Sequence, residues 1–251
     1  MRALQAATPP RAETESQPLD RRIDAHGWSR ILAELEANGF ATIPSLLEAQ
    51  ECAALVAMYP RSELFRSRVR MDAHGFGRGE YQYFAAPLPE LIATLRSQAY
   101  SRVVGLANRW PRASSADAGY PTTLEEFSAR CRAAGQSRPT PLLLKYGQGD
   151  FNRLHQDLYG TCVFPLQLTV LLSAPESDFR GGEFVLTEQR SRCQSRVHVV
   201  PLDRGDAILF AVNERPVVGA RGVSRARMRH GVSTVLAGER YALGVIFHDA
   251  Q

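Results

Sequence analysis

The sequence predicts an α+β protein that is mainly β, in which a helical layer precedes a sandwich or barrel of short strands. Before Pro139, apolar residues recur at helical spacing and are bounded by capping and stop signals. After Pro139, about seven short runs of strand-forming residues are separated by Gly, Pro, Asp and Arg. A chain of 251 residues is long enough for one large domain with a buried core, so we expect one catalytic unit.

Three segments divide the chain. Residues 1–22 are polar and lack the continuous apolar core of a secretory signal, which indicates a disordered leader. Residues 23–138 form a mainly helical support layer, and residues 139–251 form the β core. The sequence contains no internal repeat, and the change at Pro139 marks a boundary between layers rather than between independent domains.

The support layer contains stretches with apolar residues at helical spacing: 28–38, 45–59, 89–108 and 123–135. The first ends at a left-handed stop formed by Asn38 and Gly39. Ser45 and Glu48 have the spacing of a capping box that opens the second, and Thr123 caps the fourth.

The core is expected to contain short strands within these runs: PLLLKY, FPLQLTVLLS, GGEFVLTE, RVHVVPL, DAILF, GVSTVLA and RYALGVIFH. Residues 203–206 have the composition of a turn. Residues 236–239 are expected to form a tight hairpin that joins the last two runs.

The amino-acid composition limits which classes of function the protein can have. The net charge of +4 permits an anionic partner but is too small to establish nucleic-acid binding. No stretch approaches the roughly 18 apolar residues that span a bilayer, so we expect a cytoplasmic protein with no membrane partner. The cysteines form no CxxC pair, and we expect buried reduced thiols rather than a zinc cage: Cys52, Cys131, Cys162 and Cys193.

One group of residues has the composition of a metal site. His155 and Asp157 are two residues apart, so in an extended chain both side chains leave the same face. A second imidazole would complete the two-histidine, one-carboxylate triad that keeps positions on Fe(II) open. His230 is a candidate because Arg240 follows it across the expected hairpin, on a neighbouring antiparallel strand. A guanidinium at that place can bind a carboxylate with two hydrogen bonds.

Taken in order, these motifs resemble those of the 2-oxoglutarate/Fe(II) dioxygenases of the prolyl-hydroxylase type. The pieces that carry the resemblance are LLLKYGQGDFNRLHQD, LTVLLS, RGGEFVL, VPLDRGDAILF and RHGVSTVLAGERYALGVIF. The resemblance implies a double-stranded β-helix core, a jelly roll like that of the cupins. It implies that His155, Asp157 and His230 bind iron. It also implies that Arg240 grips the distal carboxylate of 2-oxoglutarate, with Tyr146 as a hydrogen-bonding partner.

The same resemblance implies the reaction. O₂ is the second cosubstrate, 2-oxoglutarate is decarboxylated to succinate and CO₂, and ascorbate is a candidate reductant. The collagen prolyl hydroxylases have a lysine at the anchor position where this sequence has Arg240. The substrate and the product, whether hydroxylated or demethylated, are left open.

The remaining histidines are expected to lie outside the metal site. His26 and His74 belong to the helical half, and His74 sits in a glycine-rich and aromatic loop of the kind that meets substrate over a barrel mouth. His198 and His248 are expected to be ordinary residues of the strand region.

A basic segment precedes the second histidine. It extends from Arg215 to Arg229 and also contains Arg221, Arg225 and Arg227. It is either a solvated loop or a surface that attracts an anionic substrate such as nucleic acid. The chain also resembles a bacterial group of these oxygenases suggested to reverse methylation damage in nucleic acids, as AlkB-type enzymes do.

The sequence leaves four functions open. The first is a dioxygenase that hydroxylates or demethylates an unidentified substrate, and the second is the same chemistry directed at methylated nucleic acid. The third is protein prolyl hydroxylation, which needs a groove for an extended peptide beside the iron. The fourth is a cupin-like protein that binds a metal without turnover. The fold does not choose among them.

Overall fold

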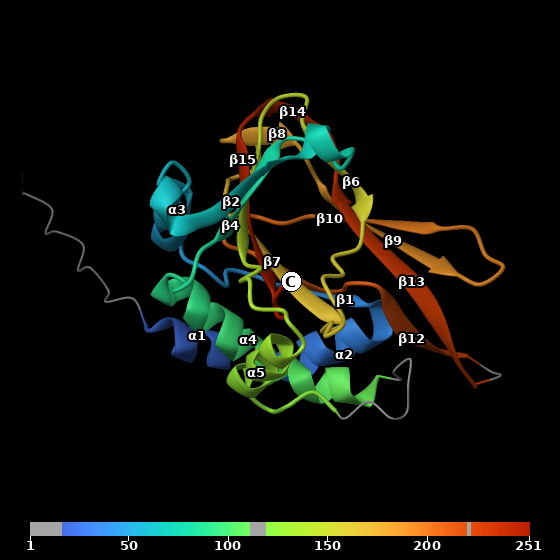
Figure 1. The fold of residues 1–251 in the computed structure, drawn as a ribbon. Coiled ribbons are helices and arrows are strands. Elements are labelled where there is room, and N and C mark those ends of the chain that lie inside the picture. The colour runs from blue at the N-terminus through green and yellow to red at the C-terminus, as the bar shows by residue number, and fades with distance from the viewer. Residues whose placement is uncertain (1–16, 111–118, 220–221) are drawn as a thin grey trace, which may run out of the picture.

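Two antiparallel sheets that face each other form the core of the protein (Figure 1). The computed structural model describes residues 17–110, 119–219 and 222–251. The larger sheet has the strand order β1-β11-β7-β15-β5-β4-β2, and the smaller sheet has the order β10-β9-β13-β6-β3, with β12 paired to β13. Strands β14 and β8 form a separate two-stranded ribbon.

The strands of the larger sheet are β1 (Phe40–Ile43), β2 (Phe65–Arg70), β4 (Glu80–Phe84), β5 (Leu142–Tyr146), β7 (Leu166–Leu171), β11 (Ala207–Ala211) and β15 (Arg240–Ile246). Those of the smaller sheet are β3 (Gly77–Arg78), β6 (Phe151–His155), β9 (Phe184–Arg190), β10 (Arg196–Val200), β12 (Glu214–Gly219) and β13 (Gly222–Val232). The ribbon consists of β8 (Phe179–Gly181) and β14 (Val235–Gly238).

The α-helices of the described residues are α1 (Leu19–Ala25), α2 (Trp28–Asn38), α3 (Ala49–Met58), α4 (Glu90–Arg109) and α5 (Leu124–Ala133). Two 3₁₀ turns, η1 (Ser62–Leu64) and η2 (Met71–His74), flank β2. In Figure 1, α1, α2, α4 and α5 gather on one side of the larger sheet.

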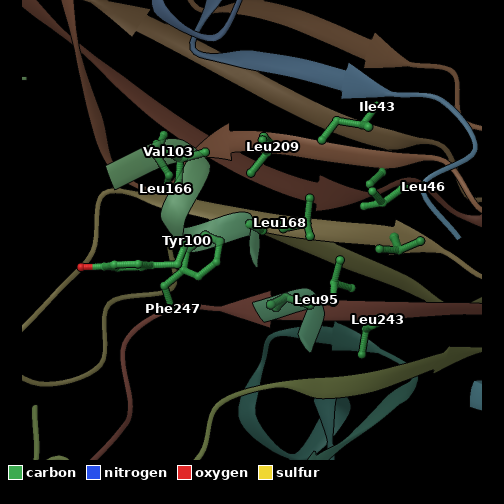
Figure 2. Packing of buried hydrophobic residues seen from close by; sticks show 14 of the residues in the cluster. Ile43, Leu46, Leu95, Tyr100, Val103, Leu166, Leu168, Leu209, Leu243 and Phe247 are labelled. Carbon is green, nitrogen blue, oxygen red and sulfur yellow. The ribbon is translucent and has the colours of Figure 1, made fainter. Parts of the chain in front are cut away.

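The main apolar core fills the space between these helices and the larger sheet. Tyr100 and Val103 of α4 are buried in one cluster with Leu166 and Leu168 of β7, as Figure 2 shows. Each of these four side chains is fully buried, which accounts for the long apolar face of α4. The helical layer therefore covers one face of the sheet and leaves the opposite face to the cavity.

Alternation along β7 separates these two faces. Successive strand residues point to opposite sides of a sheet. Leu168 and Val170 belong to the core under the helices, whereas Gln167 and Thr169 line the cavity on the other side. The central strand thus carries apolar side chains toward the helices and polar side chains toward the site.

Most of the expected helices are confirmed. The first has the predicted bounds and ends at Gly39, which has a φ of 80°. The fourth is capped by the Thr123 side chain, which accepts from the backbone N–H of Glu126. The prediction for the second was wrong in its first turn, because Glu48 and Glu51 form the capping box and α3 begins at Ala49. Acidic side chains provide the same acceptors one turn later in the sequence.

The first half of the chain also contributes strands that the sequence reading did not place. Of these, β1, β2 and β4 extend the larger sheet and β3 extends the smaller one. Their runs are short, and β1 is stabilised through its pairing with β11, far away in the sequence. Helix α1 begins at Leu19, inside the expected leader, whereas residues 1–16 lie outside the described residues. The division at Pro139 stays a prediction.

The expected hairpin between His230 and Arg240 is wrong. His230 lies on β13 of the smaller sheet and Arg240 on β15 of the larger one. Between them, β14 pairs with β8, and Gly238 reaches a φ of 77° where a Cβ would collide with the carbonyl oxygen of Asp178. The chain therefore crosses from one sheet to the other at this point.

Two smaller expectations have mixed outcomes. The turn at residues 203–206 is confirmed by the hydrogen bond from Asp206 N to Asp203 O at 3.0 Å. All four cysteines are free thiols, but only Cys52 and Cys131 are buried as expected, whereas Cys162 is partly buried and Cys193 is exposed. None of the helices among the described residues has the length and apolar composition needed to cross a bilayer.

Candidate metal centre and cosubstrate pocket

A cavity of about 200 Å³ lies between the two sheets and contains all five residues that the sequence singled out. The smaller sheet contributes His155 and His230, with Asp157 just beyond its strand β6. The larger sheet contributes Tyr146 and Arg240. The two groups therefore meet across the interior of the sandwich, although they belong to different sheets.

The three predicted metal ligands converge at one point. His155 and His230 are Cα partners in the pairing of β6 with β13, which brings their rings to a centroid distance of 4.2 Å. Nε2 of His155 lies 3.5 Å from Oδ1 of Asp157, and Nε2 of His230 lies 3.4 Å from Oδ2. One ligand atom from each residue falls within 4.8 Å of the others. Two imidazoles and one carboxylate in this arrangement have the composition of a facial triad for Fe(II).

Neighbouring groups orient the imidazoles. Nδ1 of His155 lies 2.7 Å from the carbonyl oxygen of Arg153, so this nitrogen carries the proton and Nε2 keeps its lone pair for a metal. The ring of His230 lies 4.6 Å from the ring of Phe210 and stacks on Phe184 at 6.0 Å. Both Nε2 atoms consequently point toward the same carboxylate.

The electrostatics favour the ionised form of Asp157 and the neutral form of His155. Burial alone would raise the pKa of Asp157, but hydrogen bonding and charge from His230, followed by the charge of His155, hold it well below its usual range. Burial lowers the pKa of His155, and the neighbouring His230 lowers it further. An ionised carboxylate and neutral imidazoles are the forms that bind a divalent cation.

A tyrosine not singled out by the sequence reading holds the carboxylate. The hydroxyl of Tyr159 donates to Oδ1 of Asp157 at 2.9 Å, and the hydroxyl of Tyr83 donates in turn to Tyr159 at 3.0 Å. Burial, followed by the charge of Asp157, raises the pKa of Tyr159 and keeps it protonated as a donor. The only sequence signal for this role was its position two residues after Asp157.

The opposite end of the cavity holds a buried cation. Arg240 is 2% exposed, and its Nε and Nη1 have no hydrogen-bond partner among the described residues. Its guanidinium carbon lies 5.6 Å from the ring centre of Tyr146 and 5.8 Å from that of Phe179. Burial lowers the pKa of Arg240. A guanidinium buried with unpaired donors fits an anionic ligand, and a carboxylate matches its geometry.

Tyr146 stands beside this cation as a second donor. It is the Cα partner of Arg240 in the pairing of β15 with β5. Its hydroxyl accepts a hydrogen bond from Nδ2 of Asn152 at 3.2 Å, which leaves the hydroxyl proton for a ligand. Burial raises the pKa of Tyr146 to about 12, so the hydroxyl stays protonated at neutral pH. The residues present therefore fit a dicarboxylate that reaches from Arg240 to the metal.

Three other histidines have surroundings unlike those of the triad. His248 is buried, and its Nδ1 lies 3.3 Å from the backbone N–H of Phe164. His198 lies edge-on to Phe40 at 5.0 Å. His74 stacks on Phe76 at 5.3 Å, and Phe76 lines the cavity. His74 therefore lies near the site without joining the metal ligands.

The basic segment is divided by its strand alternation. Arg215 is 3% exposed and hydrogen-bonded to Glu188, so it belongs to the interior and offers no surface for a partner. Arg225, Arg227 and Arg229 are exposed, on the face of β13 opposite to His230. Arg221 lies outside the described residues.

A known protein family and two relatives match much of this chain. Residues 79–250 match the family model Oxygenase-NA, described as an oxygenase catalysing oxidative methylation of damaged DNA. Two Mycobacterium tuberculosis proteins, each named only as uncharacterized, are 48% identical over 167 residues, which is 66% of this chain and 72% of theirs.

Solved structures show the same fold at low sequence identity. A Pseudomonas putida prolyl-4-hydroxylase matches with a TM-score of 0.54 and 14% identity, over 89% of this chain and 100% of that one. An oxidoreductase of the 2OG-Fe(II) oxygenase family from Burkholderia pseudomallei matches with a TM-score of 0.53 and 18% identity, over 90% of this chain and 93% of that one. A Trichoplax adhaerens prolyl hydroxylase matches with a TM-score of 0.56 and 18% identity, over 94% of each chain. These matches confirm the predicted double-stranded β-helix.

Proposed function

The chain belongs to the Oxygenase-NA family of oxygenases, and we propose that it works as a 2-oxoglutarate/Fe(II)-dependent dioxygenase with His155, Asp157 and His230 as its metal ligands. Arg240 and Tyr146 bind the distal carboxylate of 2-oxoglutarate. One observation carries this proposal: the triad and the buried guanidinium of Arg240, whose Nε and Nη1 have no partner among the described residues, line the same cavity from opposite sides.

Each residue has a defined task in this proposal. When bound, Fe(II) and 2-oxoglutarate supply the oxidising chemistry, in which O₂ is consumed and 2-oxoglutarate becomes succinate and CO₂. His155, Asp157 and His230 hold the metal and leave positions open for the cosubstrates. Arg240 and Tyr146 fix the dicarboxylate, and the aromatic and aliphatic walls of the cavity exclude water. Ascorbate is proposed as the reductant that keeps the metal in its ferrous state.

The test is succinate formation by anaerobically purified protein supplied with Fe(II), 2-oxoglutarate, ascorbate and O₂. We expect succinate from the wild type, none from His155→Ala, and from Arg240→Ala a higher KM for 2-oxoglutarate. His26→Ala is the matched control, because His26 does not line the cavity and should leave succinate formation unchanged. Metal binding without succinate, with or without candidate substrates, would favour the cupin-like alternative.

A second candidate narrows the substrate to methylated nucleic acid, as the family description favours. In that reaction one oxygen atom of O₂ enters a C–H bond of an N-methyl group and the other enters succinate. The resulting N-hydroxymethyl group then breaks down to formaldehyde and the unmethylated base. A surface for the phosphate backbone would come from Arg227 and Arg229, which are exposed on β13.

The candidate can be tested by DNA binding. Replacing Arg227 and Arg229 with Ala should weaken binding of single-stranded DNA and reduce the slope of log affinity against log salt by about one for each phosphate that is no longer neutralised. Arg21→Ala, an exposed substitution on α1, serves as the control. Unchanged affinity and unchanged salt slope would argue against this surface.

A further inference from the structure

The buried amide of Gln167 is a polar group in the cavity wall to which neither the metal nor the cosubstrate gives a role. Gln167 lies on β7 and is 3% exposed. Its side chain lines the cavity, and its Oε1 has no hydrogen-bond partner in the part of the chain that the structure describes. Because an amide oxygen removed from water destabilises the protein until a donor reaches it, this position indicates a ligand.

The register of the larger sheet separates Gln167 from the cosubstrate anchor. Its Cα partner on β15 is Ile246, six positions further along that strand than Arg240. This corresponds to roughly 20 Å along the sheet. On its other side Gln167 pairs with Phe210, whose ring lies 4.6 Å from that of His230. The amide thus lies at the metal end of the cavity, far from the distal carboxylate of the cosubstrate.

Aromatic rings line the cavity near the Gln167 amide and at the cavity rim. Tyr83 packs in one cluster with Ile246, and its ring lies 6.4 Å from that of Tyr159 in a T-shaped contact. Phe76 is 48% exposed and lines the cavity next to the metal-binding strand, where its carbonyl oxygen accepts from Arg153 N at 2.8 Å. Aromatic faces hold flat rings by stacking.

We propose that Gln167 recognises the primary substrate, and that this substrate presents a nucleobase whose exocyclic amino group donates to Oε1. A glutamine amide offers an acceptor beside two donors, which suits a base edge such as that of adenine. In 1-methyladenine the amino group is next to the methyl-bearing nitrogen, so a base held by its amino group at this end brings the methyl carbon toward the triad. This inference rests on the proposed dioxygenase function and assigns its substrate-recognising residue.

The test compares wild type, Gln167→Leu and Gln167→Glu, with Gln98→Leu on α4 as the matched control outside the cavity. The probe is a single-stranded DNA oligonucleotide with one 1-methyladenine, beside the same oligonucleotide unmethylated. The measured quantities are the Tm, succinate formed without DNA, the KM for 2-oxoglutarate, and formaldehyde formed with DNA. The succinate background reports the proposed function independently of Gln167.

We expect Gln167→Leu to lower kcat/KM for the methylated oligonucleotide at least about tenfold, because the amino group of the methylated base loses its buried acceptor. The succinate background and the KM for 2-oxoglutarate should stay within about twofold of wild type. Gln167→Glu keeps an acceptor, so its kcat/KM for the methylated oligonucleotide should lie between those of wild type and Gln167→Leu. This variant tests the same hydrogen bond if the leucine variant fails to fold. Gln98→Leu should match wild type.

Four outcomes would overturn the inference. Equal turnover of the oligonucleotide by Gln167→Leu and wild type would remove the recognition role. A raised KM for 2-oxoglutarate without a change in DNA turnover would assign Gln167 to the cosubstrate. A wild type that makes background succinate but no formaldehyde would refute the nucleobase while the dioxygenase function stands. Absence of succinate from the wild type would instead refute the proposed function, and the inference would fall with it.

Discussion

Asp157 is the residue on which the metal centre depends, because both imidazoles and one tyrosine turn toward its carboxylate. A metal ligand that also accepts a hydrogen bond is fixed in orientation before the metal arrives. Tyr159 supplies that bond and is itself oriented by Tyr83. Its role can therefore be separated from that of the ligands.

Tyr159→Phe should weaken metal binding by about tenfold, the lower end of the range found for groups that orient metal ligands. The loss follows from the freer rotation of the Asp157 carboxylate once its 2.9 Å hydrogen bond is gone. Titration with Co(II), followed by absorbance, measures the affinity without any turnover. Tyr241→Phe, a tyrosine outside the cavity, is the control, and an unchanged Co(II) affinity for Tyr159→Phe would contradict the prediction.

Histidines buried in their neutral form should make the stability depend on pH. Burial lowers the pKa of His248 to about 4 and also lowers that of His155. Below the ordinary histidine pKa of about 6.5 the unfolded chain takes up protons that the folded chain does not, so stability falls as the pH falls. We expect the free energy of unfolding of the metal-free protein to decrease from pH 6.5 toward pH 4.

Urea denaturation at a series of pH values measures this dependence. His248→Gln removes one of the histidines whose pKa is lowered, so its free energy of unfolding should change less over the same interval, whatever its value at pH 7. His26→Gln should reduce the pH dependence of stability less than His248→Gln does. Burial also lowers the pKa of His26, but His26 is only partly buried, whereas His248 is buried. Parallel curves for wild type and His248→Gln would show that His248 does not contribute.

At the scale of the elements, the connection from β8 to β9 supports the cosubstrate anchor. Gly181 and Gly182 both have positive φ, and a Cβ on Gly182 would lie 2.9 Å from Val235 Cγ2 and 3.0 Å from Arg240 Cδ. A residue without a side chain is needed there for two reasons, the left-handed backbone and the close approach of the arginine. The RGGEFVL motif is thus tied physically to the anchor.

Gly182→Ala should displace Arg240 and raise the KM for 2-oxoglutarate several-fold, with a loss of stability of about 1 kcal/mol or more from the strained backbone. Steady-state succinate assays at varied 2-oxoglutarate measure the first effect, and thermal unfolding measures the second. Gly27→Ala is the control, because no atom lies within 4 Å of its added Cβ. A KM equal to that of wild type would separate this turn from the anchor.

At the scale of the whole molecule, one buried arginine joins the helical layer to the end of the β core. Arg96 of α4 donates to the carbonyl oxygens of Ile246 and Phe247 and to Asp249 at 2.8–2.9 Å. Both members of the ion pair are buried. This contact fixes α4 against the end of β15, the strand that begins with Arg240.

Arg96→Met should lower the free energy of unfolding by about 3–5 kcal/mol, since it leaves the buried Asp249 carboxylate and the carbonyl group of Phe247 without their arginine donor. Urea denaturation measures the change. Arg102→Met, which removes a partly exposed arginine paired with the exposed Asp24, should change stability by no more than about 1 kcal/mol. Equal effects of the two substitutions would show that the buried clamp adds no stability.

The sequence by itself determined the local features. The helix ending at Gly39, the cap at Thr123 and the strand character of the second half follow from patterns within a few residues of one another. The five expected site residues could be named because their motifs occur in a known order, and all of them line one cavity. Their roles as ligands and anchor stay predictions.

The tertiary structure decided the rest, because it depends on pairings between distant segments. The sequence suggested that His230 and Arg240 are neighbours across a hairpin, whereas they face each other from two sheets. The strand alternation that buries Arg215 and exposes Arg227 appears only once β12, β13 and β9 are paired. Gln167 acquires its place near the metal through register with β11 and β15, since no local pattern specifies which strands a buried strand will adjoin.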